Sequence, residues 1–329
     1  MNDPGLLPRV SILIPTYNRA HYLPQTIESA LRQDYANLEV LLLDNASTDD
    51  TADVAARYGK DSRFRSLRND TNIGMVRNWR YGVYECAKGE WFLLLSDDDY
   101  LIDDRYISKA MQIARPDSDV VIVYANGYIL DEDSQTTIEI TLPFAGIVDG
   151  RQVFLSRDQV RPQDFTLCNV MFRRAVAIEQ DAFHNPNNLS CDSELFLRMS
   201  LLGRVGVCAD RVSVYRRHST NLIRGVHLNF DHLVHNTELF LLPYRLALRS
   251  GRLNAGDLEL WRSEKVARNL RRTISMLRKY HRPRLFEAVA YFSAQYGKLF
   301  WDSLTLKDRL RLELLQIGSA FNFRKDTHA

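Results

Sequence analysis

Short apolar runs alternate with stretches of helical hydrophobic spacing over the first two thirds of the chain. A run without polar residues predicts a strand that is buried on both faces of a sheet. Runs of this kind lie at residues 10–14, 38–43, 91–95, 119–124, 165–172 and 205–214, with a shorter strand at 63–67. The spacing between them predicts helices at 23–31, 47–59, 76–87, 104–114 and 191–203. This alternation predicts right-handed crossovers and an α/β fold, with a mostly parallel, Rossmann-like sheet covered by helices on both faces.

The apolar run at residues 91–95 leads into the most acidic turn of the chain. After one serine it is followed by three consecutive carboxylates: Asp97, Asp98 and Asp99. The carboxyl ends of parallel strands meet at one edge, where open α/β sheets bind ligands, so we expect Thr16 and Asp44 at the same edge. Adjacent carboxylates are costly unless a cation neutralises them, and they offer oxygen ligands to a divalent metal. The alternative is a solvated acidic turn that caps the next helix.

The last third of the chain has helical spacing only. Residues 126–163 alternate weakly, and we expect strands and loops that shape a pocket there. Helices are predicted at 233–248, with a kink near Pro243, and at 258–280, 284–301 and 305–317. The change of pattern near residue 225 predicts a domain boundary at that point.

The composition is that of a soluble globular protein, with 45% hydrophobic and 26% charged residues. No apolar run approaches the roughly 18 residues of a membrane span, and the first ten residues lack the pattern of a signal peptide, so we expect a cytoplasmic protein. The cysteines show no CxxC spacing and are expected to be reduced core thiols: Cys86, Cys168, Cys191 and Cys208. Neither GxGxxG after the first strand nor GxxxxGK[ST] occurs, which disfavours dinucleotide dehydrogenases and P-loop enzymes.

The net charge of +2 is unevenly distributed. Residues 245–329 carry 18 Lys and Arg against 8 Asp and Glu, which leaves −8 for residues 1–244. The basic tail interleaves its charges with aromatic residues: Trp261, Phe286, Tyr291, Phe292, Phe300 and Trp301. This pattern suits helices on an anionic membrane surface, peripheral to its inner face. The alternatives are packing on the preceding domain or a homodimer contact through Leu310, Leu314 and Ile317. We expect no nucleic-acid partner.

Four motifs occur in a fixed order along the strands. They are Pro15-Thr16-Tyr17-Asn18-Arg19, Asp44 to Asp49, Asn72-Ile73-Gly74 with Arg77-Asn78, and Ser96 to Asp99. In this combination, residues 8–220 resemble the family 2 glycosyltransferases with the GT-A fold. The resemblance implies a GT-A catalytic domain over residues 1–225, with a nucleotide-binding part at 1–125 and an acceptor-binding part at 126–225, followed by a helical region at 226–329.

The resemblance also implies a reaction. It is the inverting transfer of a sugar from a nucleoside-diphosphate donor, a UDP- or dTDP-sugar, to a hydroxyl of a glycan or a lipid-linked saccharide. Surface polysaccharide assembly, such as that of an O-antigen, is the implied pathway. A divalent cation, Mn2+ or Mg2+, would stabilise the leaving diphosphate, and a carboxylate would take the acceptor proton.

Individual roles follow from the motif positions. The implied nucleotide-binding residues are Pro15, Thr16, Tyr17, Asn18, Arg19, Asp44, Asn72, Arg77, Asp97 and Asp98, of which Asp44 reads the pyrimidine base. The implied metal ligands are Asp99 and Asp97, with His218 of the late Arg-x-His element as a third. Many members carry Asp at the place of Ser96, a register that moves the metal-binding acid by one position. A surface histidine is the alternative for His218.

The catalytic base of this family lies in a Glu-Asp pair that opens a helix. Here the pair reads Cys191-Asp192, so Asp192 is the implied base and its acidic neighbour is missing. A helix N-cap is the alternative for this residue. Two other classes of function stay open, namely a GT-A-like nucleotide- or glycan-binding protein without turnover and a two-carboxylate glycoside hydrolase.

Overall fold

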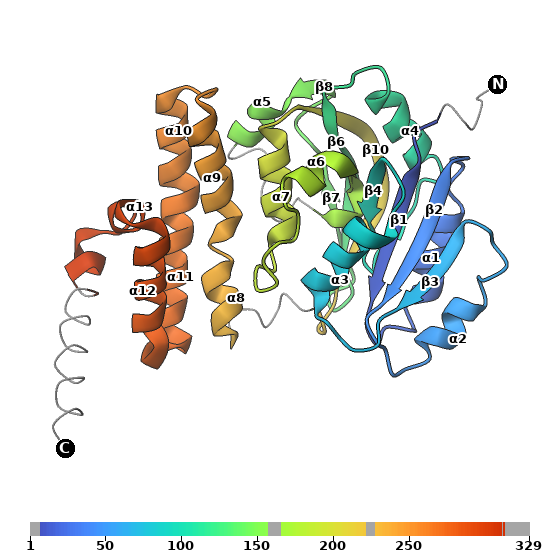
Figure 1. Ribbon diagram of the computed structural model, residues 1–329, viewed down its shortest axis with the longest axis horizontal. Helices are drawn as coiled ribbons and strands as arrows, with labels where there is room; N and C mark the ends of the chain where they lie inside the picture. The colour runs from blue at the N-terminus through green and yellow to red at the C-terminus, as the bar shows by residue number, and fades with distance from the viewer. Residues whose placement is uncertain (1–6, 157–165, 222–227, 311, 313–329) are drawn as a thin grey trace. The chain divides into compact units, whose positions relative to one another are not determined.

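A computed structural model describes residues 7–156, 166–221, 228–310 and 312 (Figure 1). The chain divides into two compact units, Met1–Asn221 and Leu222–Ala329. The boundary expected near residue 225 lies outside the described residues. Within the described ranges, no helix is both long enough and apolar enough to cross a membrane.

The first unit is built on a mixed sheet in the order β3-β2-β1-β4-β9-β6-β10-β5, with β7 beside β6 and β8 beside β10. Its strands are β1 (Val10–Thr16), β2 (Leu38–Asp44), β3 (Phe64–Arg68), β4 (Trp91–Leu94), β5 (Tyr100–Leu101), β6 (Val120–Asp131), β7 (Thr136–Ile140), β8 (Gly146–Asp149), β9 (Val170–Arg173) and β10 (Arg204–Arg217). Its helices are α1 (Leu23–Leu31), α2 (Thr51–Ala56), α3 (Met75–Tyr81), α4 (Tyr106–Ala114), α5 (Gly150–Leu155), α6 (Arg174–Glu179) and α7 (Cys191–Ser200).

Parallel pairing runs through β3, β2, β1 and β4, as the alternation of strands and helices predicts. Strands β6 and β10 are also parallel, whereas β9 runs antiparallel to both β4 and β6. The β1–β2 register pairs Thr16 with Asp44, so the first two motifs begin side by side at the carboxyl ends of their strands.

The central strands carry apolar side chains on both faces, and helices that pack against both faces of the sheet bury them. Ile12 and Val40 belong to one core cluster with residues of α1 and α4. On the other face lies a π-helical turn, Gly82–Cys86, that continues α3. A Cβ at Gly82 would overlap the end of the Leu43 side chain, so any larger residue would force this buried leucine to shift where the turn crosses β2. All four cysteines are buried and free, as expected.

Two local expectations are wrong. The helix expected at 47–59 begins only at Thr51, and the hydroxyl of Ser47 accepts the N–H of Asn18 instead. The strand expected at 165–172 begins only at Val170, since Leu167–Asn169 forms a 3-10 turn.

The second unit is helical. Its helices are α8 (Phe230–His235), α9 (Glu238–Ser250), α10 (Ala255–Trp261), α11 (Ala267–Tyr280), α12 (Leu285–Tyr296) and α13 (Lys298–Asp302). The helix expected at 233–248 is interrupted at residues 236–237, and Pro243, where a kink is expected, lies inside α9. Residues 306–310 are helical, and the rest of the helix expected to reach Ile317 lies largely outside the described residues, as do Leu314 and Ile317.

Three of the six aromatic residues singled out in the basic tail are buried in the core of this unit. Trp261, Phe292 and Phe300 are at most 1% exposed, whereas Phe286 is 46% exposed. The aromatic content of the tail therefore reflects helix packing to a large extent, because these rings fill the space between helices. The buried rings are not available to a membrane.

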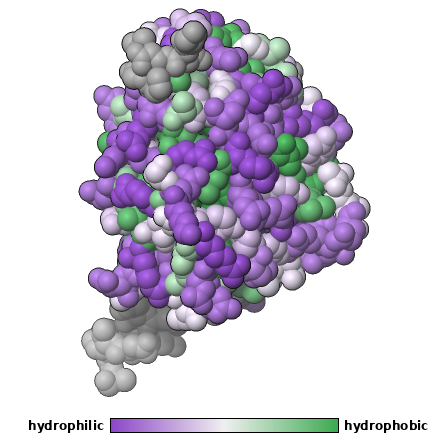
Figure 2. Space-filling view, turned by 90° about the vertical axis from the view of Figure 1, so that its right-hand side faces the viewer, coloured by the Kyte–Doolittle hydropathy of each residue, from purple (hydrophilic) through white to green (hydrophobic). Residues whose placement is uncertain are grey.

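Figure 2 shows the molecule from the side on which Figure 1 places α2 and β3. This surface is mainly hydrophilic and carries only small, separate apolar patches. Such scattered patches are normal for a solvent-exposed face.

Candidate active site

The loops after β1, β2 and β4 meet at the carboxyl edge of the sheet. The backbone N–H of Tyr17 points to Asp97 Oδ2 at 3.4 Å, and the N–H of Asn18 donates to Ser47 Oγ at 2.9 Å. Three of the four predicted motifs therefore share one site. The backbone there is locally strained, since Asn18 and Ala46 both have positive φ, at 55° and 64°.

Asp44 is buried at this edge with both carboxylate oxygens engaged. Oδ1 accepts the N–H of Ser47 at 2.8 Å, and Oδ2 forms an ion pair with Arg68 Nη1 at 2.5 Å. Arg68 also donates to the carbonyl of Ser47 at 2.7 Å. Arg68 was missed from the sequence because its contact depends on the β2–β3 register, which places it opposite Asp44.

Asn72 fixes the loop before α3. Its Oδ1 accepts from Asn45 Nδ2 and from the N–H of Gly74, each at 2.9 Å. Asn45 Oδ1 in turn accepts the N–H of Ile73 at 3.0 Å. Arg77 is exposed on α3, and no contact within the described residues joins it to the acidic turn.

The three acids of the turn face different surroundings. Asp99 is fully buried; its Oδ1 accepts the N–H of Arg216 at 2.9 Å, and its Oδ2 has no hydrogen-bond partner. Burial, together with the charge of Asp98, holds the pKa of Asp99 well above its usual range. The same two causes raise the pKa of Asp97 to about 7. Asp99 is thus turned into the protein.

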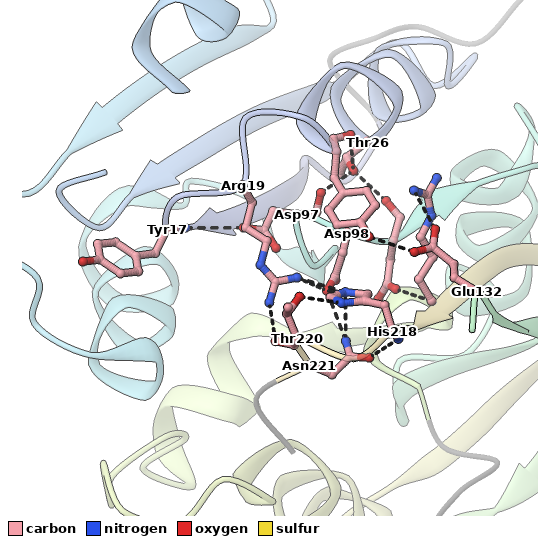
Figure 3. A network of polar contacts seen from close by, with 12 residues as sticks. Tyr17, Arg19, Thr26, Asp97, Asp98, Glu132, His218, Thr220 and Asn221 are labelled. Carbon is pink, nitrogen blue, oxygen red and sulfur yellow. Dashed lines mark hydrogen bonds and ion pairs between the residues drawn. The ribbon is translucent and has the colours of Figure 1, made fainter. Parts of the chain in front are cut away.

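Asp98 is the acid of this turn that contacts a cationic side chain and further hydrogen-bond donors. Its Oδ2 lies 2.6 Å from Arg19 Nη1, 2.9 Å from His218 Nε2 and 3.3 Å from Asn221 Nδ2 (Figure 3). The other ring nitrogen of His218 contacts Thr220 Oγ1 at 2.8 Å. Residues as far as 199 positions apart in sequence thereby form one cluster, and His218 is buried in it, not exposed on the surface.

Arg216 anchors the segment that carries His218. Its guanidinium lies over the rings of Tyr22 and Tyr100, at 5.0 and 4.8 Å from their centroids. It also contacts Gln25 and lies 3.5 Å from Glu132, which accepts the hydroxyl of Tyr22 at 2.8 Å. The sequence motif places Arg216 near the site, but these partners come from three distant elements.

Asp192 is the second residue of α7 and is partly buried. The helix N-cap is Ser190, so the capping role considered for Asp192 is not observed. Its Oδ1 accepts the N–H of Ser193 at 2.7 Å, and burial raises its pKa to about 6. Such a carboxylate is suited to accept a proton near neutral pH. Cys191, where the family has an acid, is a buried thiol.

The predicted ligand set of Asp97, Asp99 and His218 does not come together. Among the described residues, no three His, Cys, Asp or Glu side chains are arranged to hold a metal ion. His218 contacts Asp98 instead, giving one carboxylate and one imidazole at 2.9 Å. Mg2+-type sites commonly use one or two protein ligands, with substrate phosphates and water completing the shell. A carboxylate and an imidazole therefore fit a divalent cation whose remaining ligands come from other molecules.

Comparisons with known proteins identify the family and the fold. Residues 11–179 match the model of the family described as glycosyl transferase family 2. The glycosyltransferase GlyG of Streptococcus pneumoniae is 32% identical over 124 residues, which are 37% of this chain and 40% of that protein. The poly(ribitol-phosphate) beta-N-acetylglucosaminyltransferase TarS of Staphylococcus aureus is 24% identical over 212 residues, 63% of this chain and 35% of TarS. The chain thus spans about two fifths or less of the length of these curated relatives.

Two solved structures share the fold. The structure of S. aureus TarS 1-349 with UDP-GlcNAc has a TM-score of 0.58 at 14% identity, covering 89% of this chain and 90% of that one. The mannosyltransferase PcManGT from Pyrobaculum calidifontis, in complex with GDP-Man and Mn2+, has a TM-score of 0.53 at 18% identity, covering 98% and 83%. The fold is therefore the GT-A fold followed by a helical region, as the sequence predicted.

Proposed function

This chain belongs to glycosyl transferase family 2, and on that premise we propose that it is an inverting glycosyltransferase that uses a nucleoside-diphosphate sugar. The observation that carries the proposal is the cluster of Asp98, His218 and Arg19 at the carboxyl edge of the sheet, where the nucleotide loops end. A carboxylate with a raised pKa, Asp192, stands on a separate helix as the second requirement of the reaction.

The metal ligands we propose are Asp98 and His218. This moves the metal-binding acid one position from Asp99, to the register of relatives that carry Asp at the place of Ser96. Asp99 becomes a positioning residue, since it holds the backbone of Arg216 two residues before His218. A bound divalent cation would neutralise charge on the leaving diphosphate as a Lewis acid.

The chain's own residues carry the remaining steps. The loop at residues 15–19 and Asp97 would hold the nucleoside, and Asn72 would keep the adjacent loop in place. Asp192 would accept the proton of the acceptor hydroxyl while that oxygen bonds to the anomeric carbon. The bond from this carbon to the diphosphate breaks in the same displacement, so the configuration inverts and the diphosphate leaves with the electron pair.

The donor we propose is a UDP-sugar, with a dTDP-sugar as the alternative. The TarS structure of the same fold holds UDP-GlcNAc, which supports uridine, whereas PcManGT holds GDP-Man. The acceptor we propose is a hydroxyl of a glycan or lipid-linked saccharide, bound by the part of the chain at 126–225, in surface polysaccharide assembly. The poly(ribitol-phosphate) in the name of TarS supports a polymeric acceptor.

Turnover with a panel of donors tests the proposal. UDP-, dTDP-, GDP- and CDP-sugars are offered with Mn2+ and an acceptor mixture, and release of the nucleoside diphosphate is measured. Wild type should release one nucleotide preferentially, and Asp192→Asn should lose at least about a hundredfold in rate, the usual contribution of a general base. Nucleotide binding without any turnover would favour the non-catalytic protein, and glycan cleavage without nucleotide would favour the hydrolase.

We also propose that α11 faces an anionic membrane surface. Arg268, Arg272 and Lys279 are exposed and share one side of the helix, at spacings i, i+4 and i+11. No Asp or Glu occurs from residue 266 to 286. Tyr280 and Phe286 at the end of this stretch are 40% and 46% exposed. Basic and aromatic side chains together are typical of interfacial helices.

Flotation with vesicles tests this surface. Vesicles with anionic lipid should retain the wild type and lose the triple variant Arg268→Glu/Arg272→Glu/Lys279→Glu. The matched control, Arg57→Glu/Lys60→Glu, changes exposed charges of the first unit and should float like wild type. Equal flotation of all three proteins would contradict the surface, and size-exclusion chromatography of the same variants would reveal a homodimer contact instead.

A further inference from the structure

Arg19 lies against the two atoms proposed to hold the cation. Its Nη1 is 2.6 Å from Asp98 Oδ2 and 3.1 Å from His218 Nε2, and its Nη2 donates to the carbonyl of Thr220 at 3.2 Å (Figure 3). The three side chains are largely enclosed, with exposed fractions of 19% for Arg19, 9% for Asp98 and 6% for His218. One guanidinium therefore bridges the loop after β1 and the segment after β10.

A metal ion and this guanidinium exclude each other. A divalent cation such as Mg2+ keeps its ligand atoms at about 2.0–2.1 Å. A cation at that distance from Asp98 Oδ2 and His218 Nε2, on the side of the pair from which Arg19 approaches, would overlap the position of Arg19 Nη1, which contacts the same two atoms. Two positive charges in van der Waals contact inside an enclosed site also repel strongly.

We propose that Arg19 is an internal competitor for the divalent cation, displaced only when a diphosphate arrives with the metal. The inference rests on the proposed function, because it takes Asp98 and His218 as the metal ligands. Without nucleotide, Arg19 neutralises Asp98 and keeps the cation out. With nucleotide, the guanidinium exchanges its carboxylate partner for phosphate oxygens, which it binds as a planar, bidentate donor.

This exchange couples the two ligands. The metal alone must break the ion pair of Arg19 and Asp98 with no new partner for the guanidinium, so it binds weakly. A diphosphate supplies that partner, so each ligand strengthens the binding of the other by the same factor. Removal of the guanidinium abolishes the competition and reduces the coupling.

Binding of Mn2+, measured by electron paramagnetic resonance of the free ion, tests the competition without turnover. Wild type, Arg19→Ala and Arg19→Lys are titrated with Mn2+ alone and with Mn2+ plus UDP. The control is Arg57→Ala, an exposed arginine at the end of α2. Asp98→Asn shows whether the Mn2+ site is the one proposed.

Arg19→Ala should bind Mn2+ alone at least about fivefold more tightly than wild type, the lower end of typical coupling factors. Its gain in Mn2+ affinity on addition of UDP should shrink by a similar factor. Arg19→Lys keeps a positive charge that still competes, so its affinity for Mn2+ should lie between those of wild type and Arg19→Ala. This variant provides the test if the alanine variant does not fold.

The outcomes separate this inference from the proposed function. If Asp98→Asn abolishes Mn2+ binding but Arg19→Ala leaves it unchanged or weaker, the site stands and the competition is overturned. If no variant binds Mn2+ with or without UDP, or if Asp98→Asn binds it like wild type, the proposed metal site itself fails, and the competition fails with it.

Discussion

Replacement of Asp192 by asparagine should abolish a pH-dependent rate and stabilise the fold at the same time. The pKa of this carboxyl is raised by burial from 3.8 to about 6. A shift of about two units corresponds to about 3 kcal/mol, which partial exposure of the side chain reduces to about 1–2 kcal/mol. This energy is the cost of holding a charged carboxylate in a desolvated place.

The sign of the effect follows from proton linkage. An acid whose pKa is raised in the folded state binds its proton more tightly there than in the unfolded chain. Its contribution to stability is therefore complete below pH 3.8 and is lost as the pH rises through about 6. Asparagine carries no charge and can still accept the N–H of Ser193, so Asp192→Asn should be more stable than wild type at pH 8 and show no such gain at pH 4.

Two assays check the two halves of this prediction. Thermal denaturation at pH 4 and pH 8 measures the stability difference, and the rate of nucleoside-diphosphate release between pH 5 and 9 measures the titration. The wild-type rate should fall tenfold for each pH unit below about 6. The low residual rate of Asp192→Asn should not change with pH in this range. Asp53→Asn, an exposed acid in the first turn of α2, is the matched control. A variant that keeps its rate, or one that is less stable at pH 8, would refute the role of Asp192.

Further predictions concern residues that shape the site and the core. Asp99→Ala leaves the buried N–H of Arg216 without its acceptor, so it should lower stability in urea denaturation by about 1–3 kcal/mol and weaken the binding of Mn2+ in the presence of UDP. An unchanged affinity for Mn2+ would contradict the positioning role of Asp99. Ala46→Gly should raise stability by about 0.5–1 kcal/mol, since the left-handed strain it relieves, about 1–2 kcal/mol, exceeds the entropic cost of glycine; a loss would show that the strain is absent. Gly150→Ala should destabilise by about 1–3 kcal/mol or more, because its Cβ would overlap the carbonyl of Ser200, and a neutral effect in the same assay would contradict this packing.

Periodicity predicted most of the strands and helices of the first unit, because buried parallel strands are uninterrupted apolar runs. The edge at which Thr16, Asp44 and the acidic turn meet followed from the same reasoning. Spacing along the chain did not indicate which acid of the turn faces the site. That choice depends on the backbone of the turn, which directs Asp99 to Arg216 and Asp98 to His218.

The sequence also did not predict which side chains from distant strands contact the site residues. Arg68 reaches Asp44 through the pairing of β2 with β3, and Glu132 reaches Arg216 at the end of β6 beside β10. In the second unit, the sequence did not indicate which aromatic residues of the basic segment are exposed. Packing between the helices decides this, since Phe292 and Phe300 are completely buried whereas Phe286 is 46% exposed.

The most direct test of the central claim is a calorimetric titration of UDP into wild type and Asp98→Asn, with and without Mn2+. We expect UDP binding that needs Mn2+ in wild type and is lost in Asp98→Asn, because the carboxylate and His218 hold the cation that receives the diphosphate. UDP binding that is equal in the two proteins, or equal with and without the metal, would contradict the assignment of this edge as the donor site.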